Sequence, residues 1–180
     1  MQELKAKIPQ LPSDIHWHFI GHLQTNKVRD LLKLRPYLIH SVDSLHLLEA
    51  INTEAAKQGI TQDVLLEIHT AKETTKTGLL PSEIRPIIDF AGDCLGSIRL
   101  RGYMTMATNT DDETEIRRCF MDLSNLKNEV NRALAAEKSQ ISNEDVGLSM
   151  GMSDDYQIAI ECGATMVRIG SAIFGERTYN

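Results

Sequence analysis

Two short apolar segments near the C-terminal end of the sequence are each followed by glycine and serine, residue types suited to holding an anion. The segments are residues 146–148 and 165–169, and the residues that follow them are Gly151 with Ser153 and Gly170 with Ser171. Glycine lets the backbone approach a ligand closely, and a serine hydroxyl adds a donor beside the N–H groups that open a helix. Each turn is a candidate phosphate site, although glycine and serine after a strand are also ordinary turn residues.

An arginine lies inside the second of these segments. Arg168 stands among apolar residues, where a charge is costly to bury without a partner or a ligand. Residues 154–162 have helical spacing and end at Gly163, so the region is predicted to fold as strand, helix and strand, with both turns at the same end. Two adjacent strand-end turns hold a phosphate in (β/α)₈ barrels, after the seventh and eighth strands.

The preceding sequence alternates between expected strands and expected helices. The strands are expected at 17–21, 37–42, 64–69 and 99–106, and the helices at 25–34, 45–57, 82–91 and 112–136, after the end of a helix at 1–7. We expect Asp43 or Ser44 to cap the helix at 45–57, Pro86 to bend or interrupt the helix at 82–91, and a solvated linker at 137–144. With the two C-terminal segments, this order gives six strands and an α/β fold with a parallel sheet.

The composition favours one globular domain over residues 1–180. The chain has 180 residues, of which 42% are hydrophobic and 24% charged, and its net charge of −6 argues against nucleic acid or an anionic membrane as a partner. Cys94, Cys119 and Cys162 are scattered, so no disulfide framework or zinc site is indicated and a reducing cytoplasm is expected. The sequence shows no apolar run of membrane-spanning length and no signal-peptide pattern.

Four motifs, in this order along the chain, resemble those of the pyridoxal-phosphate homeostasis protein family. They are WHFIGHLQTNK at 17–27, RGYMTM at 101–106, LSMGMSDD at 148–155 and MVRIGSAIFG at 166–175. This family looks like a stand-alone form of the barrel domain of alanine racemase. The resemblance implies a (β/α)₈ TIM barrel that holds pyridoxal 5′-phosphate (PLP) at the C-terminal ends of its strands, and a role in cofactor homeostasis or delivery without robust catalysis.

The resemblance also implies a difference from the family. Family members have a lysine at the end of their first strand that forms a Schiff base with PLP, and a second strand before the motif at 17–27. Residues 2–3 resemble the helix that follows that second strand. The resemblance therefore implies an N-terminally truncated barrel with six of eight strands and without this lysine. Such a barrel has two open edges, which predicts a homodimer formed through them.

The resemblance implies a set of residues that contact the phosphate and the ring. Ser153 and the N–H groups after Gly151, with Gly170 and Ser171, would hold the phosphate. Arg168 would face the pyridine nitrogen, as its counterpart does in alanine racemase. A cation at this position keeps that nitrogen unprotonated and weakens the ring as an electron sink, which suits a carrier.

Four further residues are implied near the cofactor, with alternatives. Met104 and Met152 would lie along the ring, and plain core packing is an equal alternative for both. His18 and Asn26 mark the first strand of this chain and the loop after it, and a core histidine is an equal alternative for His18. Lys72 and Lys76 lie in a loop at the same end of the barrel and are considered as replacements for the missing Schiff-base lysine, but lysines in polar loops are usually solvated.

Two other functions stay open at this level. An amino-acid racemase needs two opposed acid–base groups across the cofactor, usually the Schiff-base lysine and a tyrosine from another domain or subunit, and neither stands in a recognisable place here. The other alternative is a barrel that binds some other phosphorylated metabolite.

Overall fold

The structure is a computed structural model that describes residues 1–73, 77–136 and 147–175. Its strands are β1 (His18–Phe19), β2 (Leu38–Val42), β3 (Gln62–Glu67), β4 (Ile98–Met104) and β5 (Gly147–Ser149). Its α-helices are α1 (Gln2–Lys7), α2 (Val28–Leu32), α3 (Leu45–Lys57), α4 (Pro81–Cys94), α5 (Glu113–Ala136), α6 (Tyr156–Glu161) and α7 (Ser171–Phe174). Two short 3₁₀ helices, η1 (Ile8–Gln10) and η2 (Thr25–Lys27), complete the order.

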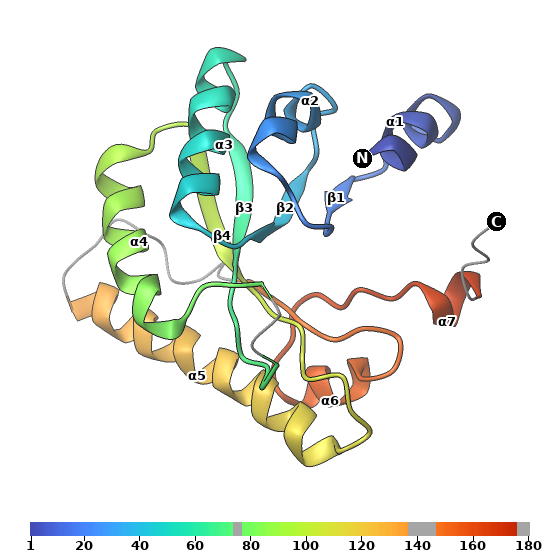
Figure 1. The fold of residues 1–180 in the computed structure, drawn as a ribbon, viewed down its shortest axis with the longest axis vertical. Coiled ribbons are helices and arrows are strands. Elements are labelled where there is room, and N and C mark those ends of the chain that lie inside the picture. The colour runs from blue at the N-terminus through green and yellow to red at the C-terminus, as the bar shows by residue number, and fades with distance from the viewer. Residues whose placement is uncertain (74–76, 137–146, 176–180) are drawn as a thin grey trace.

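The five strands form one parallel sheet in the consecutive order β1-β2-β3-β4-β5. The sheet curls, and α3 to α5 lie along one side of it, while α1 lies beside β1 near the N-terminus and α7 lies near the C-terminus (Figure 1). A consecutive order without a reversal is that of a (β/α)₈ barrel and not of a doubly wound sheet. The predicted α/β fold is therefore confirmed as part of such a barrel.

The number of strands differs from the expected six. Residues 165–169 are not a strand, although they run beside β5 and form one isolated bridge, between Ser149 and Met166. Their hydrogen bonds reach β5 and the turn after it, from Met166 N to Leu148 O and from Arg168 N to Gly151 O. In the described parts of the chain no strand pairs with the other side of this segment, so it stays extended without a full ladder.

The helices follow the expected pattern closely. Ser44, and not Asp43, caps α3, because its hydroxyl accepts a hydrogen bond from Leu47 N at 3.3 Å. Of the bend or interruption expected at Pro86, the interruption is absent, since α4 continues through this residue to Cys94. The long helix expected at 112–136 is α5, and the linker expected at 137–144 lies outside the described residues. No helix of the described residues is long and apolar enough to cross a membrane.

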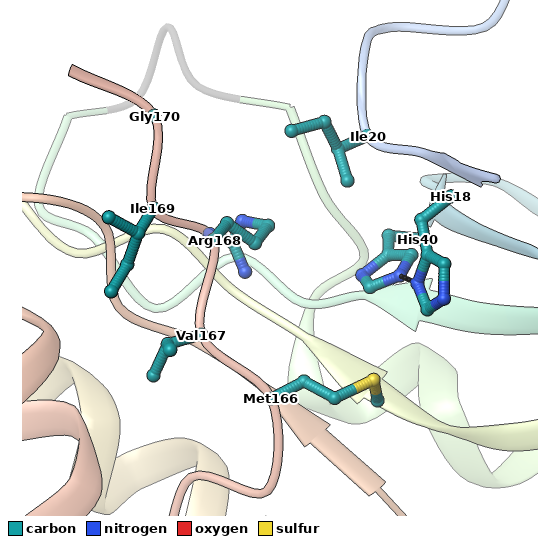
Figure 2. Close-up of a pocket in the computed structure, with 8 residues that line it drawn as sticks. All are labelled: His18, Ile20, His40, Met166, Val167, Arg168, Ile169 and Gly170. Atoms are coloured by element: carbon teal, nitrogen blue, oxygen red, sulfur yellow. Dashed lines mark hydrogen bonds between the residues drawn. The ribbon is translucent and has the colours of Figure 1, made fainter. Parts of the chain in front are cut away.

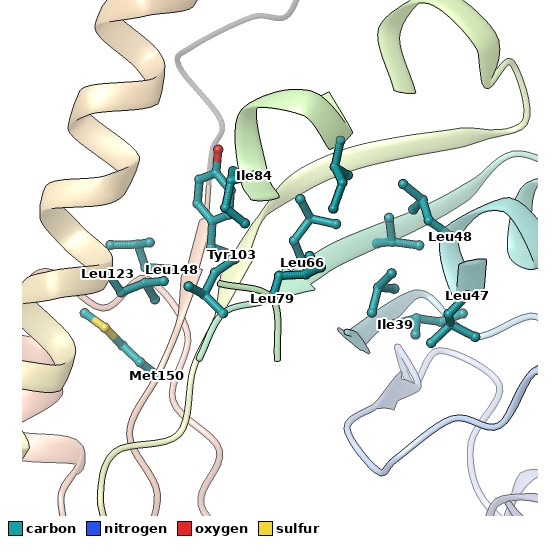
Figure 3. Close-up of a cluster of buried hydrophobic side chains, with 14 of the residues drawn as sticks. Ile39, Leu47, Leu48, Leu66, Leu79, Ile84, Tyr103, Leu123, Leu148 and Met150 are labelled. Atoms are coloured by element: carbon teal, nitrogen blue, oxygen red, sulfur yellow. The ribbon is translucent and has the colours of Figure 1, made fainter. Parts of the chain in front are cut away.

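Apolar side chains pack on both faces of the sheet. The larger cluster lies between the sheet and the helices, with Ile39 of β2 packed among residues such as Leu47 and Leu48 of α3 (Figure 3). A smaller cluster on the other, inner face consists of Leu38, Leu65 and Met104, with Met106 and Met166 against it. Side chains alternate between the faces of a strand, so His40, two positions after Leu38 in β2, also points inward. This inner face carries the polar side chains described next.

Candidate functional site

A pocket of about 420 Å³ lies between β1 and β2 on one side and residues 166–170 on the other (Figure 2). The residues that line it are His18, Ile20, His40, Met166, Val167, Arg168, Ile169 and Gly170. Three of them, His18, Arg168 and Gly170, were expected in the site from the sequence. Apolar side chains supply most of the remaining wall, which is typical of a small-molecule site with few polar groups.

Arg168 is half-buried and holds its guanidinium on neutral acceptors. Its Nη1 donates to Ser149 Oγ at 2.9 Å and its Nη2 donates to Thr105 O at 2.9 Å. No carboxylate of the described residues forms an ion pair with it, although Asp155 and Glu67 raise its pKa at longer range. Burial lowers the pKa of Arg168, but an arginine side chain remains charged at neutral pH. The pocket wall therefore carries a cation without a direct anionic partner.

A buried histidine continues the contacts of Arg168 across the sheet. His40 Nδ1 lies 2.8 Å from Ser149 Oγ, and His40 Nε2 lies 2.8 Å from His18 Nδ1. Burial, with the nearby charges of His18 and Arg168, lowers the pKa of His40 to about 3, so this imidazole is neutral at neutral pH. Burial also lowers the pKa of His18, whose ring stacks on Tyr37. The result is a chain of hydrogen bonds from Arg168 to the edge strand β1.

The two predicted turns lie side by side. Ser153 Oγ, from the turn after β5, accepts hydrogen bonds from Gly170 N at 3.3 Å and from Ala172 N at 3.2 Å. Ser171 begins α7 directly after Gly170 and is exposed. The serine of one turn thus meets the backbone donors of the other, as the strand–helix–strand pattern predicted.

Gly151 is required by the packing of α6. Its φ is +91°, a conformation that favours glycine. A Cβ added there would lie 2.6 Å from Ala159 Cβ and 3.0 Å from Tyr156 Cα. The glycine therefore lets the turn that carries Ser153 lie directly against α6.

Six of the nine expected residues do not line the pocket. Ser153, Ser171 and Gly151 lie in the two turns, outside the lining. The other three are Met104, Met152 and Asn26. Met104 is 1% exposed and packs in the inner apolar cluster, which agrees with the core-packing alternative. Met152 is 41% exposed and lies beside Ser153 in the chain, outside the pocket lining. Asn26 lies in η2, exposed and also outside the lining.

No lysine of the described residues lines the pocket. Lys72 instead forms an ion pair with Glu115, from its Nζ to Oε2 at 2.6 Å. Glu115 also accepts a hydrogen bond from Arg118, and these contacts hold its pKa well below the usual range. Lys76 lies outside the described residues.

A buried carboxyl group near the pocket was not predicted from the sequence. Glu67, at the end of β3, is 4% exposed and accepts a hydrogen bond from Thr77 Oγ1 at 2.7 Å. Burial raises its pKa, and the charge of Arg168 opposes this effect. Among the described residues no group of three His, Cys, Asp or Glu side chains could hold a metal ion.

His40 and Ser149 were also missed, although the sequence carries a signal for one of them. His40 stands within the apolar run 38–42, where a polar side chain needs a partner once the strand is buried. Ser149 ends β5, and its position shows nothing unusual in the sequence. The two residues are 109 positions apart, so only the order of strands brings them together.

Comparison with known proteins gives relatives over the whole chain. The chain is 39% identical to the pyridoxal phosphate homeostasis protein of Helicobacter pylori, over 98% of this chain and 74% of that protein. Its fold matches PipY of Synechococcus elongatus at 30% identity, with a TM-score of 0.85 without PLP and 0.79 with PLP bound, over 78% and 75% of those chains.

It also matches a crystal structure of an unknown protein from Bifidobacterium adolescentis, at 39% identity and a TM-score of 0.78. There the match covers 87% of this chain but only 60% of the other. A protein-family model described as "Alanine racemase, N-terminal domain" matches residues 9–178. The chain therefore belongs to the alanine racemase N-terminal domain family.

Proposed function

We propose that this chain binds PLP and serves in the storage or delivery of the cofactor, without robust catalysis of its own. The names of its relatives support this function, as does the PLP bound to PipY, with which the chain shares its fold and 30% of its residues. Residues 1–180 act as one PLP-binding domain in this proposal.

The observation that carries the proposal is the arrangement around Arg168. A cofactor with a pyridine ring and a phosphate needs a donor for the ring nitrogen and separate donors for the phosphate. Arg168 lines the pocket on neutral acceptors, and Gly170 lies two residues further along the same wall. In the proposal Arg168 faces the ring nitrogen, while Ser153 and the N–H groups after Gly151, with Gly170 and Ser171, hold the phosphate. The Gly170 N–H, which donates to Ser153 Oγ in this structure, would turn to the phosphate when it binds.

This arrangement suits a carrier better than an enzyme. Bound PLP supplies an aldehyde and a ring that can withdraw electrons from a substrate. Arg168 can donate a hydrogen bond to the ring nitrogen but does not give up its proton, so the nitrogen stays unprotonated and the ring withdraws electrons weakly. Racemisation also needs an acid–base pair, and the pocket lining includes no tyrosine or lysine among the described residues.

The setting of the chain is proposed on similar grounds. Cys119 and Cys162 are free and buried, which suits a reducing compartment such as the cytoplasm. A homodimer is proposed because β1 is an edge strand of two residues, and edge strands tend to pair. Ile20 and Val167 on the two sides of the pocket are 53% and 36% exposed, and a second copy would cover them.

Equilibrium binding with two ligands tests the proposal. PLP and its dephosphorylated form, pyridoxal, are titrated against the parent chain and the Ser153→Ala variant. The variant should lose about 1.5–3 kcal/mol of PLP affinity, the range for a hydrogen bond to a charged group, and should bind pyridoxal as the parent does. Ser82→Ala, at an exposed position in α4, is the matched control and should leave both affinities unchanged.

The proposal is wrong if the parent chain binds PLP no better than pyridoxal. Equal PLP affinity of the parent and the Ser153→Ala variant would instead remove Ser153 from the phosphate site. Because the two hydrogen bonds that Ser153 accepts are exposed to solvent, the loss of its hydroxyl should leave the fold intact. Circular dichroism and thermal unfolding of each variant check this point.

A further inference from the structure

Arg168 is one end of a chain of four side chains that crosses the inner face of the sheet. Arg168 Nη1 donates to Ser149 Oγ at 2.9 Å, Ser149 Oγ lies 2.8 Å from His40 Nδ1, and His40 Nε2 lies 2.8 Å from His18 Nδ1 (Figure 2 shows His18, His40 and Arg168). These side chains come from β1, β2, β5 and the segment after β5, so four separate parts of the chain determine one geometry.

With His40 neutral, the donors and acceptors of these four side chains fit together in two ways. Arg168 has only donors, so Ser149 Oγ accepts from it in both. In the first, Ser149 donates its proton to His40 Nδ1 and His40 Nε2–H donates to His18. In the second, His18 donates to His40 Nε2 and His40 Nδ1–H donates to Ser149. Both keep His40 neutral, and burial beside Arg168 favours that state, since its pKa is lowered to about 3.

Ser149 depends on His40 to stay in place. A serine hydroxyl has three staggered positions about its side-chain bond, and a fixed partner selects one of them. Ser149 is fully buried, and its two side-chain partners are Arg168 and His40. Without His40, the hydroxyl has no second contact that holds it toward the guanidinium.

The two anchors of Arg168 together set the direction of its guanidinium. Ser149 Oγ holds Nη1 and the carbonyl of Thr105 holds Nη2, which fixes the plane of the group. These contacts use two of its five N–H donors and leave the others for a ligand. Loss of one anchor leaves the group free to turn about the other.

We propose that His40 and Ser149 are positioning residues that aim the Arg168 guanidinium at the ring nitrogen of the bound cofactor. This inference rests on the proposed function and adds to it the residues that govern recognition of the ring. Neither residue needs to touch the cofactor, because each acts through Arg168.

The test compares two ligands that differ only at the ring nitrogen. One is PLP, and the other is its analogue with a CH group in place of that nitrogen. The parent should bind PLP roughly tenfold or more tightly than the analogue, since only PLP accepts the hydrogen bond from Arg168. The ratio of the two affinities measures the aim of Arg168, whereas a general weakening of the fold lowers both affinities together.

Three variants separate the roles of the residues. Ser149→Ala and His40→Leu should bring the ratio close to one. His40→Asn should keep most of it, because the asparagine amide lies near the position of Nδ1 and can still contact Ser149. His46→Asn, at an exposed position on α3, is the matched control and should leave the ratio unchanged.

Each outcome bears on a different statement. A ratio that stays at the parent value in Ser149→Ala and His40→Leu overturns the proposal, and a ratio lowered by Ser149→Ala alone overturns the role of His40. A parent that binds both ligands equally well also overturns it, while PLP binding as such stands. A parent that binds neither ligand refutes the proposed function and this inference with it. Ser149→Ala removes a single oxygen atom, so it tests the proposal even if His40→Leu fails to fold.

Discussion

Replacement of Gly151 by alanine is expected to displace the turn that brings Ser153 to Gly170. The added Cβ would lie 2.6 Å from Ala159 Cβ, closer than two carbon atoms can approach without movement. The turn and α6 must therefore move apart. Because Ser153 follows two residues later, its hydroxyl should move away from the N–H groups of Gly170 and Ala172.

Two terms contribute to the expected loss of stability. A side chain at positive φ costs about 1–2 kcal/mol, and overpacking typically costs about 1–3 kcal/mol more. A Gly163→Ala variant measures the cost of positive φ alone. The φ of Gly163, +93°, is close to that of Gly151, and the nearest atom to a Cβ added there is Ser124 Oγ at 3.9 Å, so no overpacking results. Gly163→Ala should therefore lose about 1–2 kcal/mol, and Gly151→Ala about 2–5 kcal/mol.

Urea denaturation followed by circular dichroism measures the stability of both variants, and a PLP titration measures the effect on the site. Gly151→Ala should be the less stable variant and should also bind PLP more weakly. Gly163→Ala should bind PLP like the parent, because its turn does not carry Ser153. Equal destabilisation of the two variants would refute the packing argument. Parent-like PLP binding by Gly151→Ala would show that the turn carrying Ser153 does not hold the phosphate.

Three other predictions concern the lysines, the sheet edges and the buried carboxyl group. Borohydride reduction of the PLP-loaded 180-residue chain followed by peptide mapping should find no stoichiometric pyridoxyl-lysine, since Lys72 is held by Glu115 and no described lysine lines the pocket; an adduct on Lys72, Lys76 or Lys27 would contradict this. Sedimentation at micromolar concentration should show a dimer, and a monodisperse monomer would count against pairing through β1. Burial raises the pKa of Glu67 in the folded state. The stability that Glu67 contributes is therefore complete below the pKa of a glutamate in the unfolded chain, and it is lost as the pH rises through the pKa in the folded state. The gain in melting temperature from Glu67→Gln should therefore grow from acidic toward neutral pH, and a gain independent of pH would exclude this explanation.

Local patterns in the sequence were enough for much of the fold. The cap at Ser44 and the long helix α5 depend on neighbouring residues, and both lie where the sequence placed them. The meeting of Ser153 with Gly170 could be predicted for a similar reason. It requires only that β5, the helix after it and the extended segment 165–169, which runs parallel to β5, form one unit, so that the turns after β5 and after this segment lie at the same end.

Contacts between distant strands could not be read from the same patterns. Ser149 meets His40 because β5 and β2 belong to one curled sheet, and the spacing of residues along either strand does not encode this contact. Met104 was ambiguous for another reason, since its place at the end of an alternating strand fits both a ring contact and core packing. The structure places it against Leu38 and Leu65, in the inner apolar cluster.

The partial burial of Arg168 explains why its guanidinium can bind a ligand favourably. Leu38, Leu65 and Met104 are buried together on the inner face of the sheet, and Ser149, which holds Arg168, is buried as well. A half-buried guanidinium on two neutral acceptors keeps part of its desolvation cost, which a carboxylate partner would have offset. A ligand with an acceptor atom at this point offsets that cost when it binds, in surroundings where the hydrogen bond is stronger than in water. The partial burial of Arg168 therefore lowers the stability of the folded chain and, for the same reason, makes ligand binding at this group more favourable.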